Sequence, residues 1–286
     1  MSGELFSQTL LAGVNLGAFY VLIALGFTLM YGIMGVLNMA HGTVYMIGAM
    51  IAFYIYGQAG LSFFIALPLA MLMTGLFGIL VERVLIRPSG GELLQTWLIT
   101  VALWLGLQGV AYLVFGFIAR GVQPPITGTT TILGLGISNY RLLVIGVAAV
   151  LIGGVYYLIH RTKIGLAMRA VEEDKVAATI QGVNLNMLNG FVFLIGFALA
   201  AAAGVLMAPA YSVSPTIGLT PLLKAFMIVA LGGMGSVPGA IVGGLLLGLA
   251  DSFLGVQFGI STAYILTWVM IIIILIFRPK GLMGAY

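Results

Sequence analysis

The few polar residues in this sequence are spaced in a way that does not predict catalysis. The two histidines, His41 and His160, lie far apart, and the chain has no cysteine. Because protein metal sites group several such ligands, the sequence predicts no metal site. The glycine cluster at 232–235 lacks both the lysine and the preceding strand of a phosphate-binding loop. We therefore expect no catalytic residue, no cofactor and no nucleotide-binding motif, so the chain is not predicted to be an enzyme.

Two glycine-containing segments, 31–42 and 232–239, interrupt otherwise apolar sequence that has the character of helices. Each is followed by a helix with spaced glycines, and one span later by a basic Arg-Pro pair that begins at Arg87 or Arg278. Short interrupted helices at matching positions of two halves are typical of the substrate site of a transporter. The residues predicted to line such a path are Asn38, His41, Gly42, Tyr45, Gly235 and Ser236. In the alternative, the glycines only allow close helix packing, and His41 is a helix-end side chain bonded to a backbone carbonyl.

Lys224 and Asp251 are lone charges in apolar sequence, toward the outer ends of two adjacent predicted spans. Charged groups are costly inside a membrane, where they usually pair or face a water-filled cavity. We expect either an ion pair or a shared aqueous vestibule, with two separate surface positions as the alternative.

The composition identifies a polytopic membrane protein. Apolar residues make up 62% of the 286 residues, charged residues 6%, and the mean hydropathy is +1.22. A soluble domain carries about 25% charged residues, so most of this surface must face the lipid bilayer. The net charge of +4 comes from only eleven basic residues, which argues against a nucleic-acid partner. The predicted fold is an all-α transmembrane bundle that forms one domain over residues 1–286.

Charged residues mark where the spans end, and eight to ten spans fit between them. The best count is nine, near 9–32, 43–57, 61–82, 93–117, 142–160, 188–208, 219–234, 236–254 and 259–277. Lys and Arg concentrate in 83–92, in 161–175 and in the C-terminal tail. By the positive-inside rule these segments are cytoplasmic and the N-terminus is outside. The Thr-, Gly- and Pro-rich loop at 118–141 is then periplasmic, an exposed turn region with possible short strands.

The cytoplasmic loop at 161–187 is the most polar part of the chain. Apolar residues such as Leu166, Val171 and Ile180 recur at helical spacing between its charges, which predicts one or two short amphipathic helices. Gly182 is placed to end them, and Asn184 is placed to cap the next span. We predict a docking surface for a cytoplasmic partner; the alternative is a helix that lies on the lipid headgroups.

Four motifs together resemble one family. They are the run 26–42, the loop 165–170 with Asp174, Ala177 and Gly182, the block 232–239 and the ending 278–284. In this order they are similar to the permeases of branched-chain amino acid ABC importers, specifically the LivH-type subunit, and the resemblance covers nearly the whole chain.

The resemblance implies a transmembrane permease subunit in the bacterial inner membrane. Its implied partners are a second, LivM-like permease, two cytoplasmic ATPase subunits that hydrolyse ATP, and a periplasmic binding protein that delivers leucine, isoleucine, valine or a related substrate. The residues implied to couple it to the ATPases are Gly165, Arg169, Ala170, Asp174, Ala177 and Gly182.

Two alternatives stay open. Relatives with the same motifs carry urea, short amides and other amino acids. A channel or ion-coupled secondary transporter that uses His41, Lys224 or Asp251 is disfavoured, because ion coupling usually needs buried carboxylates and the sequence has few.

Overall fold

The structure is a computed structural model that describes residues 3–132 and 135–283. Seven segments of this described chain are helical, long and apolar enough to cross a membrane. They contain α1 (Gly3–Met34), α3 (Phe63–Val81), α4 (Leu93–Phe115), α5 (Asn139–Arg161), α8 (Leu185–Met207), α10 (Val237–Phe258) and α11 (Ile260–Phe277). α3 continues through the short turns η2 (Glu82–Ile86) and η3 (Arg87–Ser89). The predicted all-α polytopic bundle is confirmed.

Two further apolar helices are short. α2 (His41–Ala52) has 12 residues before it widens into the π-helical turn η1 (Phe53–Gln58), and α9 (Leu219–Gly232) has 14. At about 1.5 Å per residue, neither α2 nor α9 alone spans a hydrocarbon core of about 30 Å. The nine predicted spans are therefore all helical, but two of them are incomplete crossings.

The interior is built around α1 and α8. Every residue of α1 from 17 to 30 and every residue of α8 from 195 to 207 is buried. α1 packs on α8, α9 and α10, and α8 packs on α2 and α3. By contrast, α4 and α11 bury only four and three residues respectively, so these outer helices leave most of their apolar surface for lipid or for a partner.

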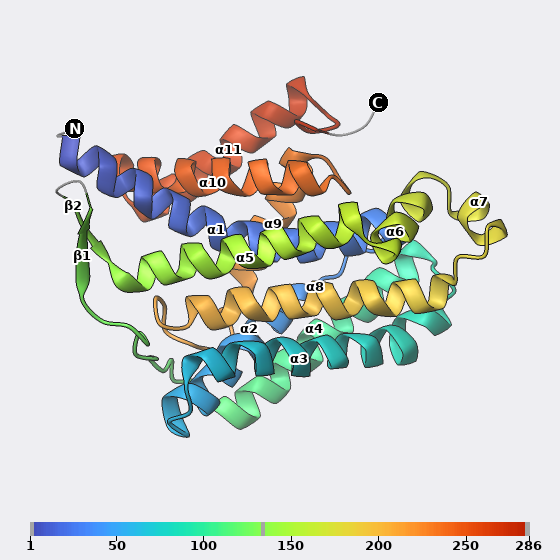
Figure 1. The fold of residues 1–286 in the computed structure, drawn as a ribbon, viewed down its shortest axis with the longest axis horizontal. Helices are drawn as coiled ribbons and strands as arrows, with labels where there is room; N and C mark the ends of the chain where they lie inside the picture. The colour runs from blue at the N-terminus through green and yellow to red at the C-terminus, as the bar shows by residue number, and fades with distance from the viewer. Residues whose placement is uncertain (1–2, 133–134, 284–286) are drawn as a thin grey trace.

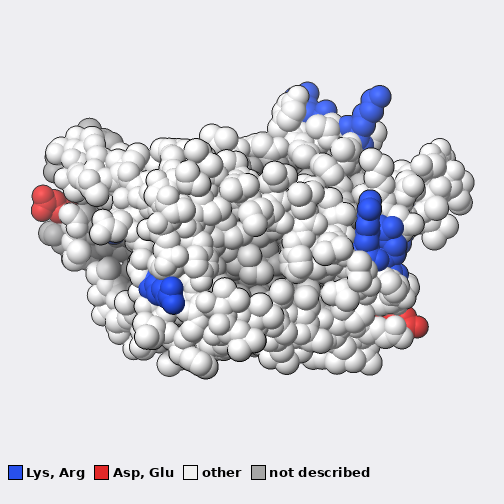
Figure 2. Space-filling model, turned by 90° about the horizontal axis from the view of Figure 1, so that it is seen from below, with Lys and Arg blue, Asp and Glu red and all other residues white. Residues whose placement is uncertain are grey.

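The two ends of the bundle differ in charge. Lys and Arg gather at the end that carries α6 (Lys163–Glu173), α7 (Lys175–Ile180) and the C-terminus (Figures 1 and 2). The positive-inside rule assigns this end to the cytoplasm, and we call it the basic end. The N-terminus and a β-hairpin lie at the opposite, outer end (Figure 1).

The hairpin belongs to the predicted exposed loop at 118–141. Its strands β1 (Thr129–Ile132) and β2 (Leu135–Ser138) pair antiparallel, with Thr129 opposite Ser138. The same loop is joined to the segment after α8, because Arg120 and Val213 exchange two backbone hydrogen bonds of 2.9 and 2.8 Å. The expected short strands are confirmed.

The predicted internal repeat has a structural counterpart. α1 and α9 both run toward the basic end and stop before a glycine in the left-handed region, Gly35 with φ 69° and Gly233 with φ 105°. After each break the chain turns back into α2 or α10, and one helix later it reaches Arg87 or Arg278. The two halves therefore share the order of elements, with a complete helix, α10, where the first half has the short α2.

Candidate functional site

A cavity of about 380 Å³ opens between the outer halves of α1, α2, α9, α10 and α11, and we call it the outer vestibule. Its polar lining includes the side chains Tyr20, Tyr45, Tyr211, Thr216, Asp251 and Tyr264. Tyr45 is thus placed at a cavity, as the predicted path requires. Phenol and threonine hydroxyls both donate and accept hydrogen bonds, so this hollow offers a small polar solute partners that lipid-facing surfaces lack.

One wall of the vestibule holds a buried ion pair. Lys224 Nζ lies 2.8 Å from both oxygens of Asp251, and the two side chains are 2% and 7% exposed. Tyr20 and Thr267 each donate a hydrogen bond of 2.7 Å to the same carboxylate. The expected pair is therefore present, and surface positions are excluded. Because both charges are compensated, the cluster ties α1, α9, α10 and α11 together around the outer vestibule.

The vestibule is closed one helical turn below Tyr45, where α2 begins. A side chain at Gly42 would overlap the Gly218 carbonyl and come within 2.8 Å of Leu222 Cβ, and a side chain at Gly218 would overlap the Gly42 carbonyl. Only glycine at both positions allows the two backbones to touch. We call this contact the outer closure.

Asn38 and His41 are buried just inside the outer closure, at 1% and 0% exposure. The side-chain oxygen Oδ1 of Asn38 accepts a 3.0 Å hydrogen bond from the Ala40 N–H, and its side-chain nitrogen Nδ2 lies 3.6 Å from the Met30 sulfur. His41 Nε2 lies 2.9 Å from the Ile23 carbonyl, whereas its Nδ1 has no hydrogen-bond partner in the described chain. Both residues therefore brace the α1–α2 junction, and neither lines the outer vestibule.

A second close approach lies at the basic end, between the two breaks. A Cβ at Gly32 would lie 3.0 Å from Gly235 Cα, and a Cβ at Gly235 would lie 3.0 Å from Glu172 Oε1 of α6. Gly235 has a φ of 90°, which further favours glycine. We call this meeting of Gly32, Gly235 and Glu172 the inner closure. Its neighbour Ser236 caps α10 by accepting a 3.1 Å hydrogen bond from the Gly239 N–H.

Glu172 is an exposed residue whose carboxylate is turned back toward the bundle. Its Oε1 lies near the two glycines, and the partial burial of this carboxylate raises the pKa of Glu172 above the usual glutamate value. Glu172, Arg169 and the end of α1 together line a small cavity of about 20 Å³. α6 therefore touches both breaks of the repeat at once.

The predicted coupling residues divide into two groups. Gly165 packs on the carbonyls of Leu158 and Ile159, Arg169 donates to the Ile159 carbonyl, and Ala170 is half-buried, so these three attach α6 to the bundle. The others shape α7. Asp174 caps it through hydrogen bonds of 2.8 and 3.0 Å from the Val176 and Ala177 N–H groups, Ala177 is exposed, and Gly182 follows the helix with a φ of 91°.

The two amphipathic helices and the Asn184 cap are confirmed, since Asn184 accepts a 3.1 Å hydrogen bond from the Met187 N–H. The expected apolar face is corrected in part. Val171 is buried as expected, but Leu166 is 60% exposed and Ile180 is 79% exposed, and Met168 is buried instead. Gly165 decides this rotation, because it allows α6 to lie directly on the α5 carbonyls and so selects the face that contains Met168.

One protein-family model matches residues 9–275, which include most of α1 and α11 and everything between them. The family is described as "Branched-chain amino acid transport system / permease component". The chain belongs to this family. The permease is 36% identical to the high-affinity branched-chain amino acid permease BraD of Pseudomonas aeruginosa, over 98% of the chain and 96% of BraD. It is 32% identical to LivH of Escherichia coli K12, over 98% of the chain and 96% of LivH.

LivM of Escherichia coli K12 is a more distant relative, 27% identical over 92% of the permease but only 67% of LivM. The resemblance to the LivH type is thereby confirmed. No solved structure matches the permease.

Sequence reasoning missed several contributors to these sites, among them Tyr20 of the outer vestibule, Gly218 of the outer closure, and Glu172, Gly32 and Thr267. Glu172 and Gly32 lie within segments already singled out, but no spacing rule indicates that they meet across about 140 residues of sequence. Thr267 carries no sequence signal, because a threonine in an apolar helix usually bonds its own backbone; here its hydroxyl is also near the Ala263 carbonyl, at 2.6 Å.

Proposed function

We propose that this permease is the LivH-type subunit of an ATP-driven importer, a single transmembrane permease domain in a bacterial inner membrane. Its partners are a second, LivM-like permease, two cytoplasmic ATPase subunits and a periplasmic binding protein. The substrate class is a branched-chain or related amino acid, in line with the names of BraD and LivH. The observation that carries the proposal is the contact of α6 with both breaks at the inner closure.

In this proposal the substrate enters the outer vestibule beside Tyr45 and passes the α2 start at Gly42, His41 and Asn38 toward Gly235 and Ser236. Both closures are shut in this structure, so substrate can pass only if the helices separate at one closure and then at the other. Alternating opening of this kind is how transporters keep the two sides of a membrane from being connected.

In this proposal α6 and α7 connect the docked ATPase to the inner closure. Val176 and Ile180 of α7 are 70% and 79% exposed at the basic end, where an apolar pair on a polar loop suits a protein partner. α7 follows α6 through the capping residue Asp174, and α6 carries Glu172 to the inner closure. A movement of a docked ATPase would therefore be transmitted to Gly32 and Gly235 through two short helices.

The buried acids support ATP coupling over ion coupling. Asp251 is paired with Lys224, and Glu82, which is 1% exposed, is paired with Arg87 at 2.6 Å. A carboxylate that already holds a basic partner is poorly suited to exchange a proton or sodium ion with each transport cycle.

The docking role can be tested on the complete complex with Ile180→Asp. We expect this variant to lose the ATPase subunits during purification, because a charge replaces an exposed apolar contact. Ile118→Asp is the matched control, since Ile118 is 78% exposed but lies in the outer loop. Equal retention of the ATPases by both variants would show that α7 is not the docking surface.

The substrate class is tested separately, by uptake into proteoliposomes that contain the complete complex. Labelled leucine should be transported and urea or a short amide should not. Uptake of urea or the amide in place of leucine would move the permease to the alternative substrate class.

A further inference from the structure

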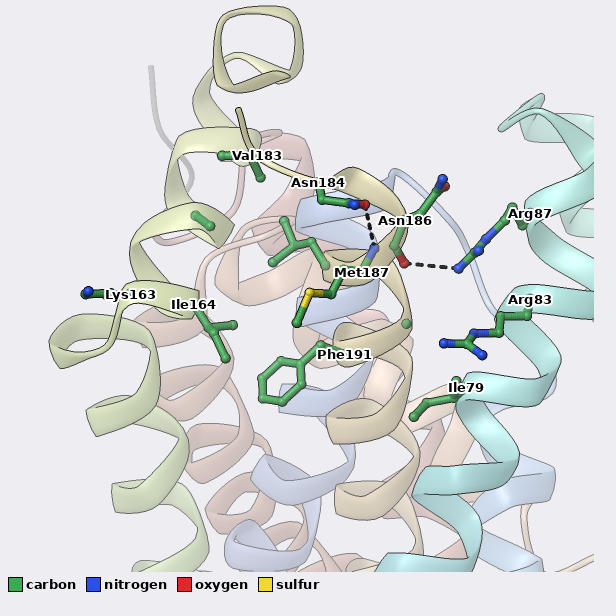
Figure 3. Close-up of a pocket in the computed structure, with 13 residues that line it drawn as sticks. Ile79, Arg83, Arg87, Lys163, Ile164, Val183, Asn184, Asn186, Met187 and Phe191 are labelled. Carbon is green, nitrogen blue, oxygen red and sulfur yellow. Dashed lines mark hydrogen bonds between the residues drawn. The ribbon is translucent and has the colours of Figure 1, made fainter. Parts of the chain in front are cut away.

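A cavity of about 600 Å³ forms a groove at the basic end between α3, α6 and α8 (Figure 3). Ile79 and Arg83 form one wall, Lys163 and Ile164 form the other, and Met187 and Phe191 of α8 lie between them. We call this cavity the basic groove. None of the residues that line it belongs to either closure or to the outer vestibule.

The basic groove carries uncompensated positive charge. Arg87 at its rim is neutralised, because its guanidinium binds both oxygens of Glu82 at 2.6 and 3.1 Å and the Asn186 carbonyl at 3.1 Å. Arg83 and Lys163 are exposed and make no ion pair in the described chain, and no acidic residue lines the groove. The Arg83 guanidinium points into the groove, and Lys163 stands at the opposite edge (Figure 3).

Apart from Asn184 and Asn186, the rest of the lining carries no polar side chain, and it extends into the membrane-spanning part of the bundle. Met187 is 74% exposed and Ile164 is 37% exposed, and both line the basic groove. Phe191 lies seven residues beyond the capping Asn184, about 10 Å along α8. A bilayer has a headgroup layer of roughly 5–8 Å on each side of its hydrocarbon core. The groove therefore runs from headgroup depth into the depth of the acyl chains.

We propose that the basic groove binds an anionic phospholipid of the cytoplasmic leaflet. Its phosphate would lie against Arg83, whose planar guanidinium suits bidentate binding of phosphate oxygens, with Lys163 as the second cation. One acyl chain would follow Met187 and Phe191 into the bundle. Basic pockets between membrane helices on the cytoplasmic side have this combination of charge and depth.

The occupant follows from the combination of features. A free anion would leave the apolar surface of Met187 and Phe191 uncovered, and a neutral lipid would leave Arg83 and Lys163 without a counter-charge. An anionic phospholipid satisfies both. Bound there, it would lie against the first turn of α6, at Lys163 and Ile164, on the helix that reaches the inner closure.

The test is native mass spectrometry of the purified complex, exchanged into nanodiscs of either phosphatidylglycerol or phosphatidylethanolamine. The wild type should retain phosphatidylglycerol in preference to phosphatidylethanolamine. The double variant Arg83→Gln/Lys163→Gln should lose this preference. Its retention of phosphatidylglycerol should fall by about tenfold or more relative to the wild type, since each interfacial cation contributes about 1 kcal/mol.

The matched control is Arg161→Gln/Lys175→Gln, which removes the same two residue types from the basic end without touching the groove. It should retain phosphatidylglycerol as the wild type does. Equal loss of phosphatidylglycerol from both double variants would show only a general attraction between charges. Wild-type retention by Arg83→Gln/Lys163→Gln would show that the basic groove does not bind the lipid. Crosslinking from a photoreactive residue at Met187 must label lipid; labelling of the second permease instead would show that a protein fills the groove. Because none of these measurements uses transport, they stand or fail independently of the proposed function.

Discussion

The outer vestibule and the inner closure each contain an acidic residue, and the two are held very differently. Asp251 is buried, paired with Lys224 and hydrogen-bonded by Tyr20 and Thr267. Glu172 sits at the surface, and its carboxylate faces two glycines that offer it no side-chain partner. The first arrangement fixes four helices in one geometry. The second lacks such bonds and can separate at small cost, as the proposed opening of the inner closure requires.

The largest effect should come from breaking the outer pair. Lys224→Met leaves Asp251 buried without its counter-charge, so we expect a loss of about 3–5 kcal/mol in the free energy of unfolding. Thermal unfolding of the purified complex measures it. The double variant Lys224→Met/Asp251→Leu should recover most of the loss. If the single variant is as stable as the wild type, Asp251 is not a fixed wall of the vestibule.

The outer closure should be the next most sensitive position. Gly42→Leu forces a branched side chain against the Gly218 backbone, so uptake should fall to background, with overpacking of about 1–3 kcal/mol. Gly57→Leu places the same side chain on an exposed glycine that meets only Phe53, at 3.7 Å. Full uptake with Gly42→Leu would mean that substrate does not pass this contact.

His41→Ala and Asn38→Ala separate the path from the packing alternative. Both side chains brace α1 against α2, so their loss should lower thermal stability. If they also line the path, uptake should fall further than stability and assembly do. If Gly42→Leu, Asn38→Ala and His41→Ala each show normal uptake, the segment 31–42 serves only in helix packing.

At the basic end, Arg169→Glu should uncouple the complex without unfolding it. The change removes the bond to the Ile159 carbonyl and places a second acid beside Glu172. We expect ATPase activity to stop responding to the loaded binding protein while the subunits still assemble. Arg161→Glu, at the last residue of α5, serves as the control. If the loaded binding protein stimulates the ATPase activity of the Arg169 variant as in the wild type, α6 does not transmit the movement of the ATPases.

The smallest effect should come from Glu172→Gln, within about 0.5 kcal/mol at neutral pH. Its pH dependence is the sharper measurement. Because partial burial raises the pKa of Glu172 in the folded state, folding binds a proton there, and stability is lost as pH rises from about 4.3 through that raised pKa. Thermal scans across this range should show a shallower decline for Glu172→Gln, whereas Glu173→Gln is the control at the neighbouring exposed position.

What the sequence predicts well in this protein is local. The short helices at 163–182, the Asn184 cap and the incomplete spans follow from periodicity, capping residues and glycine placement, which act over a few residues. Spans near 188–208 and 259–277 lie within three residues of α8 and α11. The Lys224–Asp251 pair was also predictable, because two lone charges in apolar sequence have few other partners.

What it does not predict is how segments meet. The Leu166 face was assigned from periodicity alone, and a glycine contact with α5 rotates the helix away from it. The Gly32–Gly235–Glu172 contact joins three segments whose side chains carry little pattern of their own. His41 shows the same limit, since its type suggests chemistry whereas its surroundings give it a backbone carbonyl and an edge contact with Phe27.

The two-bond bridge between Arg120 and Val213 gives the outer surface its own mechanical connection to the interior. Arg120 is anchored by Phe53 and Phe115, whose ring centres lie 5.4 and 4.8 Å from its guanidinium carbon. Val213 precedes Gly218 by only five residues. A protein that pulls on the hairpin-bearing loop from outside would therefore also pull on the turn that ends in Gly218. In the proposed importer, the binding protein would act on the outer closure and the ATPases on the inner closure, so neither signal would have to cross the full thickness of the bilayer.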